Sequence, residues 1–154
     1  MREADVSGCA AIVQASPLWT RYGIRTPEAA RGAFEDVLEG TCLGFVAEDA
    51  GKVVGFVVYA LAGTFVHSGY VRSVAVAPDA QHRGIGGRLM DAAEAAVLGR
   101  GPNVFLFVST WNTGAQRFYE RRGYRRIGEV PDYMRRGVTE VLYRKTLGPI
   151  QRDE

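Results

Sequence analysis

The chain has 154 residues, of which 47% are hydrophobic and 23% are charged, and its formal net charge is +2. This is ordinary usage for a compact globular protein, and so small a charge argues against a dedicated nucleic-acid partner. No apolar run approaches the length of a membrane helix, and no signal peptide is evident. With only Cys9 and Cys42, a reduced, cytoplasmic setting is favoured over a disulfide framework.

The first third of the chain predicts one short strand followed by two helices. Residues 1–4 are expected to form the strand, and a helix is expected over 8–15, capped by Asp5 or Ser7. Residues 16–25 read as a loop. A Thr-Pro-Glu sequence from residue 26 then gives an N-cap with Pro at the first helical position, which predicts a helix over 26–39.

A hairpin and a buried strand are expected next. Strands over 42–48 and 53–61 flank the short polar turn 49–52, which is typical of a β-hairpin. The stretch 70–77 is apolar and partly β-branched, as a buried strand should be, and Pro78 ends it because proline cannot donate to a ladder.

A glycine-rich loop follows that strand and opens an amphipathic helix. Gly84, Gly86 and Gly87 precede an apolar stripe at helical spacing. A helix start of this kind offers bare backbone N–H groups and the positive end of the helix dipole, so it predicts an anion site, usually for phosphate. The alternative is a glycine turn that only lets the helix pack closely on its strand.

The spacing of the loop indicates which phosphate ligand it suits. A P-loop requires Lys and Ser/Thr after the last glycine, and neither is present. A dinucleotide fingerprint needs a third small residue where this chain has Leu89. The pattern that fits is Gln/Arg-x-x-Gly-x-Gly/Ala, supplied by Gln81, Gly84 and Gly86. This resembles the acetyl-CoA pyrophosphate loop of the GNAT family, the GCN5-related N-acetyltransferases.

A second segment matches the same family. A strand over 104–108 precedes a short helix that begins near Asn112 and ends at Gly123. The family's next motif is Asn-x-x-Ala-x-x-Phe-Tyr-x-x-x-Gly-Phe/Tyr. Its places are filled by Asn112, Ala115, Phe118, Tyr119, Gly123 and Tyr124.

The chain closes with strands over 125–129 and 138–147. The predicted fold class is therefore α/β, with a mixed central sheet of about six to seven strands and helices on both faces. This is the element order of the GNAT fold, and residues 1–154 are expected to form a single domain. The resemblance further implies a splay between the two central strands, which admits the pantetheine arm of the cofactor.

The resemblance implies acetyl-CoA as the acyl donor and assigns its contacts, with no metal. Backbone groups of Val74 and Val76 would pair with the pantetheine amides, and the amides from His82 to Gly87 would hold the pyrophosphate. Tyr119 would be the general acid that protonates the leaving thiolate; its alternative role is core packing. The implied cofactor-binding residues are Val74, Val76, Gln81, His82, Arg83, Gly84, Ile85, Gly86, Gly87 and Asn112.

Arginines cluster late in the chain, where the ordinary interpretation is a solvated surface. Arg83 and Arg121 are the best placed by motif position to pair with coenzyme A phosphates. A nucleotide-binding or nucleic-acid-binding module is the alternative that this cluster raises. The missing P-loop and dinucleotide features count against that alternative.

The general base is not apparent. Relatives carry Glu five residues before the motif Asn, where this chain has Phe107, and the strand before the loop offers only Tyr70, Arg72 and Ser73 as polar groups. Three interpretations remain open. A water relay to a more distant group serves as the base, an acceptor amine of lowered pKa needs no base, or the protein binds acetyl-CoA and transfers poorly. The distant candidates are Glu48, His67 and Glu140.

The acceptor site is expected in the segments least bound by motifs. They carry Leu18, Trp19, Tyr22, Arg25, Asp132, Tyr133 and Arg135. Aromatic rings beside a carboxylate suit a cationic amine or a peptide N-terminus, and equally a lid or a homodimer surface. The implied function is acetyl transfer to an amine of a small molecule or peptide, by direct attack in a ternary complex. The alternative is a non-catalytic acyl-CoA sensor.

Overall fold

The computed structural model describes residues 1–151, which divide into two compact units. The first unit comprises Met1–Ala60 and Val71–Ala96, and the second comprises Leu61–Tyr70 and Val97–Glu154. The prediction of one domain over residues 1–154 stays a prediction. No helix within residues 1–151 is long and apolar enough to cross a bilayer.

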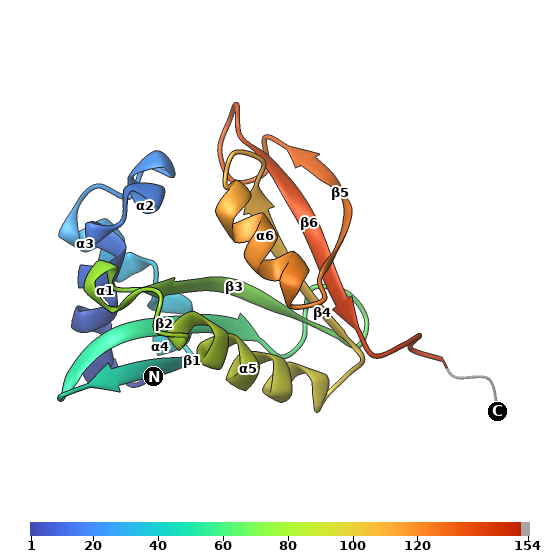
Figure 1. The fold of residues 1–154 in the computed structure, drawn as a ribbon, viewed down its shortest axis with the longest axis horizontal. Helices are drawn as coiled ribbons and strands as arrows, with labels where there is room; N and C mark the ends of the chain where they lie inside the picture. The colour runs from blue at the N-terminus through green and yellow to red at the C-terminus, as the bar shows by residue number, and fades with distance from the viewer. Residues whose placement is uncertain (152–154) are drawn as a thin grey trace. The chain divides into compact units, whose positions relative to one another are not determined.

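Six strands form one sheet in the order β1-β2-β3-β4-β6-β5, and Figure 1 shows them with the helices. The α/β fold class and the expected number of strands are confirmed. The pairs β1–β2, β4–β6 and β5–β6 are antiparallel. The strands are β1 (Leu43–Asp49), β2 (Lys52–Ala60), β3 (Ser68–Val76), β4 (Asn103–Ser109), β5 (Arg125–Pro131) and β6 (Thr139–Thr146).

The start of the chain is helical, so the expected strand over 1–4 is wrong. A 3-10 turn, η1 (Glu3–Asp5), stands there because the Asp5 carboxylate accepts the Arg2 amide at 2.6 Å, which curls the backbone. The N-terminal ammonium instead donates to the Gly44 carbonyl at 2.7 Å. The helix expected at 8–15 is present as α1 (Val6–Ala15).

Two further segments of the first unit differ from expectation. The expected loop 16–25 contains α2 (Pro17–Arg21), which begins with Pro at its first position. The expected helix over 26–39 is split into α3 (Pro27–Gly32) and α4 (Glu35–Leu38) at Phe34. The Phe34 ring is buried edge-on against Phe56, with 5.0 Å between centroids. Core packing here overrides the local helical pattern.

The β1–β2 hairpin closes through Ala50 and Gly51, which both have positive φ, at 49° and 76°. Two left-handed residues between antiparallel strands match the natural twist of a hairpin. β2 supplies the core of this unit, with Phe56, Val57 and Val58 fully buried. After β3 come a 3-10 turn, η2 (Pro78–Ala80), and the 14-residue helix α5 (Ile85–Leu98).

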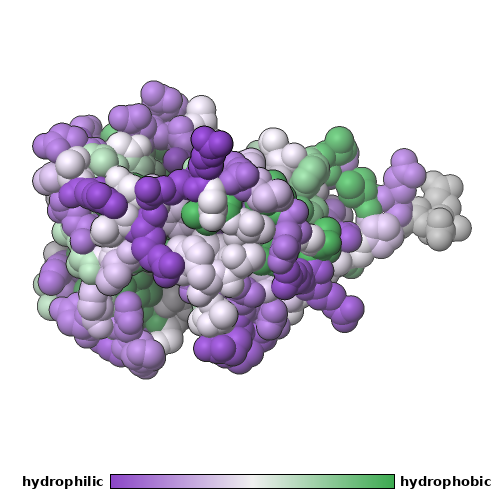
Figure 2. All heavy atoms as spheres, turned by 90° about the horizontal axis from the view of Figure 1, so that it is seen from above, coloured by the Kyte–Doolittle hydropathy of each residue, from purple (hydrophilic) through white to green (hydrophobic). Residues whose placement is uncertain are grey.

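The second unit is built on β4, β6 and β5, with helix α6 (Thr113–Arg121). Val104, Leu106 and Val108 alternate along β4 and are buried. Gly123, at φ 88°, ends the helical segment in the left-handed conformation expected of a C-terminal glycine. The exposed large hydrophobic residues of this unit include Phe65, Val66 and Leu147, and Figure 2 shows hydrophobic side chains at the surface beside the C-terminal segment.

Candidate functional site

The glycine loop of the first unit is an exposed left-handed turn that leads directly into α5. His82 and Gly84 have φ of 61° and 75°. A Cβ on Gly84 would meet nothing within 4 Å, so it is the backbone conformation, not space, that requires glycine there. The Arg88 amide donates to the Gly84 carbonyl at 3.1 Å, which is the first bond of the helix.

It follows that the amides of Ile85, Gly86 and Gly87 lie before the first intrahelical bond, where N–H groups have no helical acceptor. Ile85 anchors this turn because its side chain is buried, whereas the two glycines add no side chain over their amides. The local geometry is therefore suited to an anion that approaches the backbone closely.

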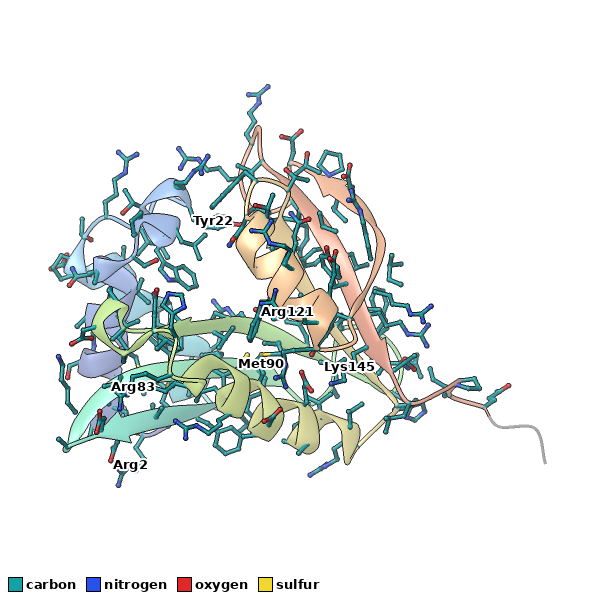
Figure 3. All side chains as sticks on the ribbon, viewed as in Figure 1. Arg2, Tyr22, Arg83, Met90, Arg121 and Lys145 are labelled. Atoms are coloured by element: carbon teal, nitrogen blue, oxygen red, sulfur yellow. The ribbon has the colours of Figure 1, made fainter. Side chains whose placement is uncertain are left out.

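Side chains of the loop bind to the strands of the same unit. The Gln81 carboxamide donates to the carbonyl of Val76 at 3.3 Å, which ties the loop back to the end of β3. The Arg83 guanidinium lies beside the start of α5 (Figure 3) and pairs with the Asp49 carboxylate at 2.9 Å. Both are exposed, so these contacts orient the side chains but leave them accessible to a ligand.

Val74 and Val76, half-buried, are the last alternate residues of β3. Immediately after them, the Ala77 amide donates to the Val54 carbonyl at 2.8 Å, which holds the end of β3 against β2. The Val76 carbonyl accepts Gln81, so a pantetheine amide that paired with this carbonyl would share it with Gln81 or displace that side chain.

Gly55 in β2 also shapes the loop, and the sequence analysis did not single it out. A Cβ there would lie 3.0 Å from Leu89 Cδ1, 3.1 Å from the Ala75 carbonyl oxygen and 3.2 Å from Ile85 Cγ2. Only a bare Cα lets the first turns of α5 pack so close to the sheet. An isolated glycine inside a strand pattern is the signal that could have indicated this approach.

In the second unit, Asn112 is the N-cap of α6. Its Oδ1 accepts the Ala115 amide at 3.2 Å. The carboxamide also carries an NH2 group with two donors, and the side chain is half-buried. The capping role accounts for Asn at the start of the motif, and the NH2 group is the part suited to a cofactor contact.

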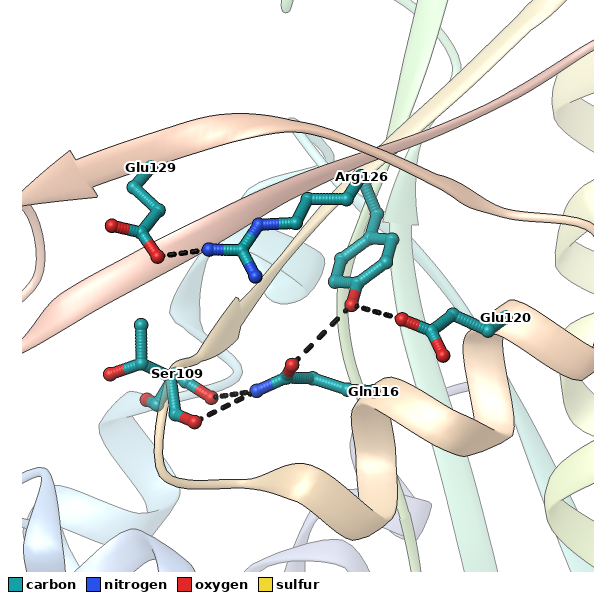
Figure 4. Close-up of polar contacts among 7 residues, drawn as sticks. Ser109, Gln116, Glu120, Arg126 and Glu129 are labelled. Atoms are coloured by element: carbon teal, nitrogen blue, oxygen red, sulfur yellow. Dashed lines mark hydrogen bonds and ion pairs between the residues drawn. The ribbon is translucent and has the colours of Figure 1, made fainter.

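Helix α6 is fixed to the sheet by a set of side-chain hydrogen bonds that Figure 4 shows. Gln116 Nε2 donates to the carbonyls of Ser109 and Thr110 at 3.1 and 2.9 Å. The Tyr143 hydroxyl of β6 donates to Glu120 at 2.9 Å and approaches the Gln116 oxygen at 3.5 Å. Burial, together with the bond to Glu120, raises the pKa of Tyr143 to about 12.

Tyr119 lies in the last turn of α6 and is only 8% exposed. Its ring makes edge-on contacts with Phe118 and Tyr124, at centroid distances of 5.2 and 5.6 Å. Its carbonyl accepts the amides of Arg122 and Tyr124. The ring is thus part of the packing, and that packing would hold the ring of a catalytic tyrosine in place.

The candidate bases lie in different surroundings. Phe107, at the place where relatives carry Glu, packs against the rings of Tyr70 and Tyr133. Glu140 is 1% exposed and accepts the Ser109 hydroxyl at 3.1 Å, so it is a buried, hydrogen-bonded carboxylate of the second unit.

Glu48 and His67 are both exposed. Glu48 belongs to β1 in the first unit, and His67 directly precedes β3 in the second, with φ of 51°. Glu48 therefore belongs to a different unit from His67 and Glu140. Within residues 1–151, no group of three His, Cys, Asp or Glu could hold a metal ion.

Most late arginines lie on the surface, as the ordinary interpretation expected. Arg121 is exposed, and Arg122 lies over the Phe118 ring at 5.8 Å. Arg126 pairs with Glu129 in β5. Such exposed pairs contribute little to stability.

The expected acceptor segments fall in both units. In the first, α2 carries Trp19, whose indole N–H is buried without a hydrogen-bond partner among residues 1–151. In the second, the β5–β6 turn carries Tyr133, which is 56% exposed, and Asp132, whose Oδ1 accepts the Gly137 amide at 2.6 Å. Asp132 has a φ of 56°, so the turn is a defined structure.

Comparisons with known proteins agree with both motifs. The family described as acetyltransferase (GNAT) matches residues 11–124. An uncharacterized N-acetyltransferase of Chlorobaculum tepidum is 32% identical over 127 residues, which cover 82% of this chain and 76% of that protein.

Solved structures share the fold at lower identity. A ribosomal-protein-alanine N-acetyltransferase from Brucella melitensis is 22% identical with a TM-score of 0.74, over 96% of this chain and 97% of that one. An aminoglycoside 6′-N-acetyltransferase complexed with coenzyme A is 16% identical with a TM-score of 0.77, over 99% and 95%. The names of these two enzymes give unlike acceptors, so the shared fold does not select one.

Proposed function

The chain belongs to the acetyltransferase (GNAT) family and is an N-acetyltransferase, and from that premise we propose that it moves the acetyl group of acetyl-CoA to the amine of a small molecule or a peptide. The observation that carries the proposal is the exposed left-handed turn at Gly84, which presents the free amides at the start of α5. The related structure with bound coenzyme A supports the same donor.

The proposed cofactor contacts follow the two motifs. Backbone groups of Val74 and Val76 would pair with pantetheine, and the Asn112 NH2 group would donate to the coenzyme A arm. The pyrophosphate would lie on the loop and the first turn of α5. Its ligands would come from Gln81, His82, Arg83, Gly84, Ile85, Gly86 and Gly87.

The reaction that we propose is a direct transfer. A neutral amine attacks the thioester carbonyl carbon, so an N–C bond forms while the C–S bond breaks. The nitrogen loses its extra proton to solvent, and the departing thiolate takes a proton from the Tyr119 hydroxyl, which solvent restores. Neutral arrival of the amine matters because Phe107 leaves no carboxylate at the place of the usual base.

The presence of Phe107 where relatives carry Glu also favours a second candidate function, a sensor that binds acyl-CoA without transferring the acyl group. The two candidates share every cofactor contact and differ only in turnover. We further propose a reducing, cytoplasmic setting, supported by the free thiols Cys9 and Cys42.

A melting experiment tests donor binding. Acetyl-CoA at about 100 times its Kd should stabilise the protein by about 2.7 kcal/mol, while NAD and ATP leave the Tm unchanged. Gly84→Val should abolish the shift, because a β-branched residue is strained at positive φ and covers the amides. Gly40→Val is the matched control, since Gly40 also has positive φ and open space but lies outside the loop. An unchanged Tm with acetyl-CoA would overturn the proposal.

Turnover is then measured with a panel of amines and peptides, by following release of free coenzyme A thiol. Release that depends on an amine supports the transferase. Tight acetyl-CoA binding with no release on any acceptor would instead identify the sensor.

A further inference from the structure

The two faces of β4 have different neighbours. The Tyr143 hydroxyl reaches Gln116 and Glu120 of α6, so Tyr143 points to the α6 side of the sheet. Tyr143 stands directly opposite Leu106 in the β4–β6 register, and directly opposite residues of an antiparallel pair share a face. Since side chains alternate along a strand, Phe105 and Phe107 point to the other face.

That other face carries a row of aromatic rings from three segments of the second unit. The rings of Phe65 and Phe105 are 4.8 Å apart at 63°, and those of Tyr70 and Phe107 are 6.2 Å apart at 66°. The Tyr133 ring lies 4.7 Å from Phe107 at 35°. Phe65, Tyr70, Phe105, Phe107 and Tyr133 are called the aromatic row below.

The aromatic row is accessible. Phe65 is 54% exposed and Tyr133 is 56% exposed, while the other three rings are half-buried. By contrast, Val104, Leu106 and Val108, on the α6 side of the same strand, are buried. A soluble protein rarely leaves neighbouring aromatic rings at its surface unless they contact a ligand or a partner.

Three charged groups near the aromatic row already make hydrogen bonds within the protein. Glu140 shares the face, because it stands opposite Ser109, and it is buried with the Ser109 hydroxyl on its carboxylate. Arg144 stands opposite Phe105 and donates to Asn103 at 2.8 Å. Asp132 uses one oxygen for the Gly137 amide. The face therefore offers ring surface to a ligand and little free negative charge.

We propose that the acceptor is a small primary amine carried on an aromatic ring, and that this ring lies on the aromatic row. The proposal rests on the proposed function, because it names the acceptor of that same transfer. Aromatic pairs in edge-on or offset contact gain free energy beyond that of the area that they bury, and a saturated ring of equal size lacks that gain. A polyamine has no aromatic ring to pack on the row, and it meets two exposed arginines, Arg135 and Arg136, in the adjoining turn.

The test compares three acceptors on the purified full chain with acetyl-CoA: 2-phenylethylamine, 2-cyclohexylethylamine and spermidine. Both kcat/KM for thiol release and the Kd of each amine for the coenzyme A-loaded protein are measured. The phenyl amine should exceed the cyclohexyl amine by about fivefold or more. Spermidine should be the weakest of the three.

Variants of the aromatic row test whether the preference for the phenyl amine arises there. Phe107→Leu and Tyr133→Leu should bring the phenyl-to-cyclohexyl ratio close to one, and Tyr133→Phe, which keeps the ring, should retain it. Phe45→Leu is the matched control, because Phe45 is a partly exposed ring stacked on Tyr59 in the other unit. Tyr133 lies in an exposed turn, so its variants keep the test open if Phe107→Leu fails to fold.

A wild-type ratio near one, or a preference for spermidine, overturns the aromatic acceptor. These results differ from failure of the proposed function, which would appear as an unchanged Tm with acetyl-CoA. If acetyl-CoA binds and no amine turns over, the ratio of the Kd values of the cyclohexyl and phenyl amines decides the proposal, with the same fivefold criterion.

Discussion

At the residue scale, the Asn112 carboxamide can be divided into its two functions. Asn112→Asp keeps an oxygen on the Ala115 amide and removes the NH2 donors, so stability should hold while acetyl-CoA binding weakens by roughly 10-fold. Asn112→Ala should also lose about 1 kcal/mol of stability with the cap. Urea unfolding and titration calorimetry measure the two effects. Full acetyl-CoA affinity in Asn112→Asp would show that Asn112 is a cap alone.

Tyr119→Phe removes one hydroxyl and keeps the ring that packs against Phe118 and Tyr124. If that hydroxyl protonates the thiolate, kcat should fall by roughly 10²-fold, the usual scale for a lost general acid. Stability and acetyl-CoA affinity should change little, because the bond matters most as charge grows on sulfur. Tyr124→Phe, the same change on a neighbouring ring, is the control. Wild-type turnover in Tyr119→Phe would leave Tyr119 a packing residue.

Tyr143 gives a pH-dependent prediction for stability. Its pKa is raised from 10.0 to about 12 in the folded protein, so the folded state holds this proton more tightly than the unfolded state. The stabilisation is complete below pH 10 and is lost as the pH rises to about 12. Tyr143→Phe should lose roughly 1 kcal/mol at neutral pH and show a shallower fall in that window. Urea unfolding at several pH values measures this effect. Parallel pH profiles of the free energy of unfolding for the wild type and Tyr143→Phe would contradict the prediction.

At the scale of elements, the packing of α5 on β2 depends on Gly55. Gly55→Val should destabilise the protein by about 1–3 kcal/mol and weaken acetyl-CoA binding, because the added atoms push Ile85 and Leu89 away and shift the helix start. Gly128→Ala in β5 is the control, since its Cβ would meet nothing within 4 Å. Thermal melts with and without acetyl-CoA measure both effects. Unaltered acetyl-CoA affinity in a destabilised Gly55→Val variant would show that Gly55 does not influence the glycine loop.

At the scale of the whole molecule, the state of the cysteines indicates which kinetic mechanism to expect, a ternary complex or a covalent intermediate. Burial raises the pKa of Cys9 to about 12 and also raises that of Cys42, so neither is a thiolate nucleophile at neutral pH. We therefore expect direct transfer in a ternary complex, with intersecting initial-velocity lines. Incubation with acetyl-CoA alone should leave no acetyl group on the protein by mass spectrometry. Parallel lines, together with an acetylated cysteine, would require a covalent route instead.

Much of the fold and the conformation of the glycine loop are local in sequence, and the sequence by itself determined them. Alternation and apolar runs located all six strands, and Pro78 marked the end of β3. The conformation of the glycine loop can be predicted from a few consecutive residues, because a positive φ is a property of the backbone at Gly84 itself. The same holds for the start of α6, where Asn112 caps its own helix.

Only the tertiary structure decided the features that depend on residues distant in the chain. Phe34 breaks the helix expected over 26–39 because its ring packs on Phe56, and Gly55 matters because Leu89 approaches it. The sequence places Phe107 where relatives carry Glu, but only the fold shows that Tyr133 of the β5–β6 turn lies against it. Contacts of this kind add up across the fold and can outweigh a local propensity of a few tenths of a kcal/mol. That is why the sequence defined the glycine loop while the aromatic row became visible only in three dimensions.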